Sequence, residues 1–193
     1  MKFIHVTDSH LITPGEKLND LDPADRFSAC IDSINRTHSD AACMVVTGDL
    51  ADRGEETAYE FLAAELDRCA VKSYLLLGNH DDRQYFQHWF PDIPIDENGF
   101  TQYVWQSPEG VFVFLDTLKQ GTHSGEYCET RREWLKETLA RFQNKPVYLF
   151  MHHPPFDLHL PCIDRIGLED QEAFAEIVQP NDSIRHLFFG HAH

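Results

Sequence analysis

Five times along the chain, a short apolar run ends in a compact polar cluster. The runs cover residues 2–7, 42–47, 71–77, 147–151 and 184–189. The clusters that follow them are Asp8-Ser9-His10, Gly48-Asp49, Gly78-Asn79-His80-Asp81, His152-His153 and Gly190-His191-Ala192-His193. In open α/β sheets, ligands bind beyond the carboxyl ends of the strands, where residues far apart in the sequence meet. We therefore expect the five clusters to converge in one crevice.

The pattern of apolar residues indicates an α/β fold. Residues 103–105 and 111–115 join the five runs above as expected strands. Helical periodicity is seen in four stretches between strands, at residues 27–34, 59–69, 129–142 and, more weakly, 168–178. The run Met44-Val45-Val46 is apolar on both faces, as in a parallel sheet covered by helices, whereas the strands around Gly110 resemble a hairpin. We therefore expect mixed sheets.

Length and charge narrow the class of function. A chain of 193 residues suits one hydrophobic core, so we expect one domain over residues 1–193. The net charge is −16, from 32 acidic and 16 basic residues, and this charge would repel a phosphate backbone. A nucleic-acid polymer is therefore not an expected partner. A small anionic substrate stays open, because bound metal ions can reverse the local field.

The cysteines and the apolar runs bear on the compartment. Five cysteines are widely spaced and include no Cys-x-x-Cys pair, so we interpret them as reduced thiols. No apolar run reaches the length of a membrane span, and Asp8 and His10 stand where a signal peptide needs apolar residues. We expect no membrane partner, and the cytoplasm is the default compartment.

The polar clusters offer the ligands that borderline divalent metals prefer, namely imidazole nitrogens with carboxylate and amide oxygens. Seven candidates are Asp8, His10, Asp49, Asn79, His152, His191 and His193. They would serve two cations if Asp49 bridges them. Two metals about 3.5 to 4 Å apart can clamp the attacking and leaving oxygens of an in-line displacement. One Asp-x-His or Gly-Asp pair alone is more often a turn, but five successive clusters favour metal binding.

The order Asp-x-His, Gly-Asp, Gly-Asn-His-Asp, His-His and Gly-His-x-His resembles the calcineurin-like metallophosphoesterase signature. Residues 48–54, 78–82 and 150–155 look like the branch of class III cyclic-nucleotide phosphodiesterases and bacterial glycerophosphodiesterases. The resemblance implies a four-layer αββα sandwich, in which two mixed sheets pack face to face between helices. Relatives continue beyond the position of His193, so we expect this chain to be C-terminally incomplete relative to the family.

The resemblance also assigns roles to the candidate residues. Asp8, His10, Asp49 and His193 would hold one metal, and Asp49, Asn79, His152 and His191 the other, with iron, manganese or zinc as the expected ions. A hydroxide bridging the two metals would be the nucleophile. His80 would give a proton to the leaving group or clamp the substrate, and Asp52 would orient His80 through its other ring nitrogen.

Other residues leave alternatives open. His153 has two equally favoured roles, to support the metal ligands or simply to pack against its neighbours. His123 lies in an expected loop that either borders the site or is plain surface. The aromatic residues at positions 85–90 are expected to pack a helix, with a role in walling the pocket as the alternative. The acidic surplus is interpreted as a solvated surface.

The predicted function is metal-dependent hydrolysis of a small phosphodiester, either a cyclic nucleotide or a glycerophosphodiester. Phosphomonoester hydrolysis is an alternative within the same chemistry. A scaffold or binding module with impaired catalysis is an alternative from another class, although His80 and all seven ligand candidates are present. Formation of a homo-oligomer is left open.

Overall fold

The computed structural model describes residues 1–193, which form two compact units, Met1–Ile93 and Pro94–His193. Each unit contains one β-sheet with its own helices.

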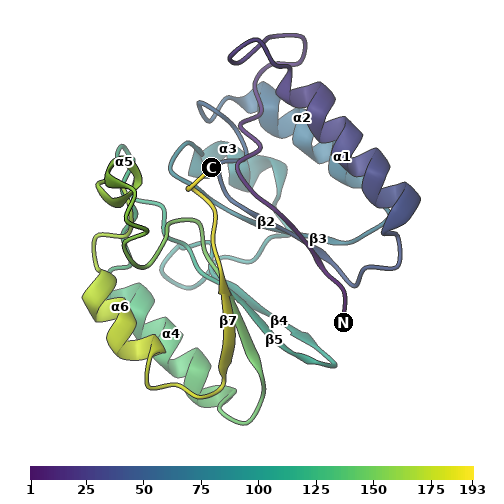
Figure 1. The fold of residues 1–193 in the computed structure, drawn as a ribbon. Helices are drawn as coiled ribbons and strands as arrows, with labels where there is room; N and C mark the ends of the chain where they lie inside the picture. Colours follow the sequence, from purple (N-terminus) through teal and green to yellow (C-terminus); the bar gives the residue numbers. More distant parts are fainter. The chain divides into compact units, whose positions relative to one another are not determined.

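The first unit is built from alternating strands and helices (Figure 1). Its elements are β1 (Ile4–Val6), α1 (Pro23–Thr37), β2 (Met44–Thr47), α2 (Glu56–Asp67), β3 (Ser73–Leu76) and α3 (Arg83–Trp89). The three strands are parallel in the order β1-β2-β3, with Ile4 opposite Met44 and Met44 opposite Ser73. Parallel neighbours need a crossover connection, which α1 and α2 provide.

The sequence explains where helix α1 begins and which faces of α1 and α2 are buried. The Asp22 side chain accepts hydrogen bonds from the backbone N–H groups of Ala24 and Asp25, and Pro23 occupies the first turn, where it costs no hydrogen bond. Residues with helical spacing, including Phe27, Ile31 and Ile34 on α1 and Tyr59 and Leu62 on α2, are buried. The two helices lie side by side in Figure 1. Both predicted apolar faces are confirmed.

The second unit holds a four-stranded mixed sheet. Its elements are β4 (Tyr103–Ser107), β5 (Gly110–Phe114), α4 (Glu129–Arg141), β6 (Val147–Phe150), α5 (Pro161–Asp164), α6 (Gln171–Val178) and β7 (Ile184–Phe188). The strand order is β4-β5-β6-β7, with an antiparallel β4–β5 hairpin and parallel pairs after it. The predicted hairpin at Gly110 is therefore confirmed. One face of the sheet, including Val113 and Leu149, packs with Leu135 of α4 and Phe174 of α6.

Two rows of rings cross the other face of this sheet. Because directly paired residues point to the same face, the register places Tyr103, Phe114, Phe150 and Phe188 in one row and Trp105, Phe112, Tyr148 and His186 in the next. Ring centroids along the first row are 4.5, 5.5 and 4.9 Å apart. Along the second row they are 5.0, 5.3 and 5.9 Å apart. We call these eight side chains the aromatic face.

The α/β class, the two sheets with helices and all seven predicted strands are confirmed. One correction concerns the first unit, whose sheet is entirely parallel rather than mixed, because a helix separates each pair of successive strands. The aromatic residues near position 86 form α3, and Phe86 packs against Tyr59 of α2. Face-to-face packing of the sheets and the single domain stay predictions.

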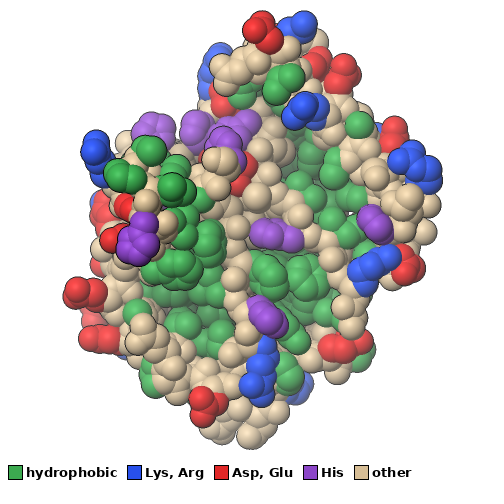
Figure 2. All heavy atoms as spheres, viewed as in Figure 1, with side chains coloured by type: hydrophobic (Ala, Val, Ile, Leu, Met, Phe, Trp, Pro, Cys, Tyr) green, Lys and Arg blue, Asp and Glu red, His purple; other side chains and the backbone are tan.

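Acidic side chains are spread over the visible surface with basic ones among them (Figure 2). This distribution agrees with the interpretation of the acidic surplus as a solvated surface. No helix of the structure combines the length and apolar character needed to cross a membrane.

Candidate metal centre

In the first unit, the loops that follow β1 and β2 run alongside each other. The backbone N–H groups of Asp8 and His10 donate to the carbonyl oxygens of Gly48 and Asp49, at 3.2 and 2.9 Å. Asp8, His10 and Asp49 all have positive φ angles, of 54°, 41° and 48°. Positive φ is uncommon for residues other than glycine, and clusters of such residues occur at functional sites. The local backbone is thus shaped to present these three side chains.

The imidazole of His10 is oriented by one carboxylate toward two others. Its Nδ1 lies 3.1 Å from Oδ1 of Asp52, so the Nε2 atom faces the opposite way. Nε2 lies 3.6 Å from Oδ2 of Asp49 and 4.0 Å from Oδ1 of Asp8. A carboxylate that binds the distal nitrogen of a histidine is the usual support for a metal-binding imidazole. Three predicted ligands of the first unit are therefore close together.

His80 lies beside this group. Its backbone N–H donates to Oδ1 of Asp49 at 2.9 Å, and its ring is 4.8 Å from that of His10. The Nδ1 atom of His80 lies 2.5 Å from the main-chain carbonyl oxygen of Asp52. The contact between Asp52 and His80 thus involves the carbonyl group, whereas the Asp52 carboxylate binds His10. The orienting role predicted for Asp52 toward His80 stays a prediction, and the atom of Asp52 that makes the contact is its carbonyl oxygen.

Asp81 is a residue whose role the sequence did not reveal. Only 3% of it is exposed, and its carboxylate accepts hydrogen bonds from the N–H groups of Leu50, Ala51 and Gly78. The hydroxyl of Tyr59 also donates to Asp81, at 2.9 Å, and accepts from the N–H of Asp82, at 2.8 Å. Burial raises the pKa of Asp81 to about 6, and the neighbouring Asp49 carboxylate contributes to the rise. Asp81 therefore ties the loop that carries Asp49 to the loop that carries Asn79 and His80.

Gly78 allows these two loops to approach. A Cβ atom at Gly78 would lie 2.2 Å from Oδ1 of Asp49 and 2.3 Å from its backbone nitrogen. No side chain fits there without a shift of the Asp49 loop. Asn79 follows Gly78 in the same loop and is half-buried.

The second unit contains a separate group of histidines. His152 and His153 follow β6, His191 follows β7 with a φ of 68°, and all three are buried. Nδ1 of His191 lies 3.3 Å from Nε2 of His152, and each ring is 4.8 Å from that of His153. His193 lies two residues after His191 and is exposed.

The donor atoms of each unit suit a divalent metal. In the first unit, ligand atoms of His10, Asp49 and His80 all lie within 4.8 Å of one another. In the second unit, those of His152, His153 and His191 meet the same condition. Imidazole and carboxylate without thiolate are typical of zinc, iron and manganese sites.

Comparison with known proteins gives the family. The model of the calcineurin-like phosphoesterases matches residues 1–193. The chain belongs to this family. A probable cyclic nucleotide phosphodiesterase of Rhodopseudomonas palustris is 42% identical over 196 residues, an alignment that covers 100% of this chain and 72% of that protein.

Two more distant relatives have names that state two kinds of activity. A cAMP/cGMP dual specificity phosphodiesterase of Mycobacterium tuberculosis is 30% identical, with 98% of this chain and 61% of that protein covered. A probable glycerophosphodiester phosphodiesterase of Arcobacter nitrofigilis is 27% identical, with 100% of this chain and 72% of that protein covered. This chain therefore spans less than two thirds of the length of the mycobacterial relative and more than two thirds of that of the Arcobacter relative.

The fold has matches among solved structures. The purple acid phosphatase PPD1 from yellow lupin matches with a TM-score of 0.68 and 13% identity, over 99% of this chain and 37% of that one. TT1561 of Thermus thermophilus matches with a TM-score of 0.57 and 12% identity, over 93% of this chain and 77% of that one. At these identities the likeness concerns the fold alone.

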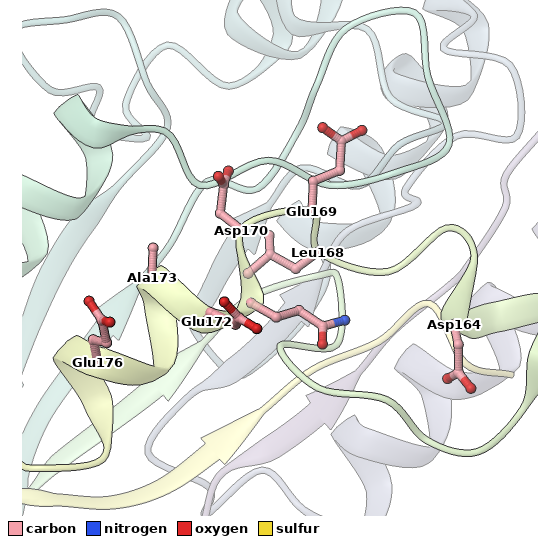
Figure 3. Close-up of a pocket in the computed structure, with 8 residues that line it drawn as sticks. Asp164, Leu168, Glu169, Asp170, Glu172, Ala173 and Glu176 are labelled. Atoms are coloured by element: carbon pink, nitrogen blue, oxygen red, sulfur yellow. The ribbon is translucent and has the colours of Figure 1, made fainter.

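A pocket elsewhere in the second unit does not suit the substrate of a phosphoesterase. It is lined by carboxylates from α5, from α6 and from the segment before α6 (Figure 3): Asp164, Glu169, Asp170, Glu172 and Glu176. Carboxylates repel a phosphate group unless a cation lies between them. None of the predicted metal ligands lines this pocket.

Proposed function

We propose that this chain hydrolyses a phosphodiester of a small molecule at a centre of two divalent metal ions. The observation that carries the proposal is the group of Asp8, His10 and Asp49, in which one imidazole nitrogen faces two carboxylates. The family and the activities named for the relatives support the reaction class.

The metal ligands are proposed from the family pattern. Asp8, His10, Asp49 and His193 would hold one ion, and Asp49, Asn79, His152 and His191 the other, with iron, manganese or zinc as the ions. Bound there, the ions would supply a water of lowered pKa and neutralise charge on the phosphoryl oxygens. The groups of each unit described above support this assignment.

His80 is proposed as the proton donor. A carbonyl oxygen only accepts hydrogen bonds, so the contact with Asp52 requires a proton on Nδ1 of His80. The proton given to the substrate is then a second one, which Nε2 carries in the doubly protonated form of the ring. Donation to the leaving alkoxide by such a group contributes about 10² to 10⁴ in rate.

The substrate is proposed to be a cyclic nucleotide or a glycerophosphodiester. Both are small, and both are diesters, as the names of the relatives of this chain indicate. The net charge of −16 argues against a polymeric polyanion as substrate.

The test compares hydrolysis of bis(p-nitrophenyl) phosphate with that of p-nitrophenyl phosphate. Metal-stripped protein is reloaded with manganese, iron or zinc before each assay, and cyclic AMP and glycerophosphodiesters follow as natural substrates. We expect metal-dependent activity with preference for the diester. Preference for the monoester would show that the protein is a phosphomonoesterase and not a diesterase. Absence of activity with every metal would overturn the proposal.

A further inference from the structure

His153 has hydrogen-bond partners for both of its ring nitrogens. Nδ1 lies 2.8 Å from the hydroxyl oxygen of Thr117, and Nε2 lies 3.2 Å from the carbonyl oxygen of His123. The backbone N–H of His153 also donates to the Thr117 hydroxyl oxygen, at 3.3 Å. Thr117 and His123 both belong to the segment between β5 and α4.

These contacts determine the tautomer of His153. The carbonyl of His123 can only accept, so Nε2 carries the proton. The Thr117 hydroxyl lies within hydrogen-bond distance of Nδ1 and can serve it as donor or as acceptor. Both ring nitrogens are thus engaged by protein atoms, and neither is available to a metal, although His153 belongs to the histidine group of the second unit.

Packing holds the ring against its two neighbours. Its ring centroid is 4.8 Å from that of His152, at an interplanar angle of 90°, and 4.8 Å from that of His191, at 46°. Gly125 closes another side, because a Cβ atom there would lie 2.4 Å from Cγ of His153. His153 therefore cannot move without displacing Gly125 or one of the two other histidines.

Arg131 of α4 holds both ends of the segment that carries these partners. Its Nη1 donates to the carbonyl oxygens of Asp116 and Leu118, at 3.0 and 3.2 Å, and its Nη2 donates to Oε2 of Glu126, at 2.8 Å. Only 1% of Arg131 is exposed. We call residues 116–126 the clamp segment.

We propose that His153 is a positioning residue for the metal ligands His152 and His191, with the clamp segment as its frame. The inference rests on the proposed function, because it takes these two histidines as ligands. It decides between the two roles left open by the sequence, support and simple packing, in favour of support.

The test uses Thr117→Val, which keeps the volume of the side chain but removes the hydroxyl group. Thr117→Ser restores the hydroxyl. Thr122→Val is the matched control, since the Thr122 hydroxyl donates to the carbonyl oxygens of Lys119 and Ser124 within the same segment. Manganese affinity and stoichiometry are measured by calorimetry, and the unfolding temperature of the metal-free protein is recorded. Gly125→Ala serves as a second disturbance of the ring.

We expect Thr117→Val and Gly125→Ala to weaken manganese binding by about 10- to 100-fold, while Thr117→Ser and Thr122→Val stay near wild type. Unchanged affinity in folded Thr117→Val protein would overturn the inference and leave packing as the role of His153. Nitrogen-15 NMR of the metal-free wild type gives a separate readout, because a proton on Nδ1 of His153 instead of Nε2 would also overturn it. If wild type binds no manganese, iron or zinc, the proposed function fails. The NMR measurement of the His153 tautomer does not depend on metal binding, so the two failures can be told apart.

Discussion

Oδ1 of Asp52 lies 3.1 Å from Nδ1 of His10, so a side chain of the loop after β2 orients an imidazole of the loop after β1. The carbonyl group of the same residue contacts His80. Asp52 therefore serves two histidines with two different atoms, and a substitution of its side chain separates the two contacts.

The first prediction concerns this separation. Asp52→Ala removes the support of His10 but keeps the carbonyl that contacts His80, so we expect metal affinity to fall by about 10- to 100-fold. Asp52→Asn retains a side-chain oxygen and should lose less. Manganese titration measures both, with the exposed Asp25→Ala as the control. Equal affinities of wild type and Asp52→Ala would show that His10 needs no such support.

Asp49 is predicted to be required for both metals. Asp49 is 2% exposed, and its carboxylate faces Nε2 of His10 and accepts from the backbone N–H of His80. Asp49→Ala should reduce bound manganese from two ions to one or none and abolish hydrolysis, as measured by metal analysis after dialysis and by the diester assay. Retained activity would show that Asp49 does not bridge the two metals.

His80 is predicted to act on the substrate and not as a ligand. His80→Ala should retain the metal content of wild type while turnover falls by about 10² to 10⁴. The exposed His38→Ala is the control for loss of a histidine. If turnover of His80→Ala equals that of wild type, the proton comes from elsewhere.

Gly78 is predicted to be intolerant of a side chain. Gly78→Ala would place a methyl group 2.2 Å from Oδ1 of Asp49, and relief of such a clash typically costs about 1 to 3 kcal/mol of stability. Gly99→Ala is a useful comparison, since it meets no atom within 4 Å, although its φ of 85° carries a strain of its own. Urea denaturation of the metal-free proteins measures the difference. A Gly78→Ala protein as stable as wild type would contradict the close approach of the loops.

Tyr59 is predicted to stabilise the first unit through its hydroxyl group. Tyr59→Phe would leave the buried Asp81 carboxylate with one donor fewer and the N–H of Asp82 without this acceptor, a loss of about 1 to 3 kcal/mol. Burial raises the pKa of Tyr59 far above its ordinary value, so the hydroxyl remains a donor at any ordinary pH. Urea denaturation measures the loss, with the exposed Tyr85→Phe as the control. Identical stability of the two variants would argue against the hydrogen-bond network.

Much of the fold was predictable because strand and helix periodicities are local. The polar clusters were visible because each directly follows a strand, as His152 follows β6. The role of Asp81 was hidden, because its donors come from three separate segments of the chain. The two possible roles of His153 could not be separated, since Thr117 and His123 lie far from it in the sequence. The four-residue helix α5 was missed, being too short to show a helical period.

The aromatic face has a consequence for how the second unit forms. Tyr103 and Phe114 stack across a hairpin whose turn is only Pro108 and Glu109, so little chain entropy is lost when this pair meets. Phe150 and Phe188 join the row through parallel pairings, each of which must close a long loop that contains α4 or α6. The hairpin is therefore the part of the sheet whose formation costs the least chain entropy, and we expect it to form first. Its stacked rings then give β6 and β7 an apolar surface on which to pack.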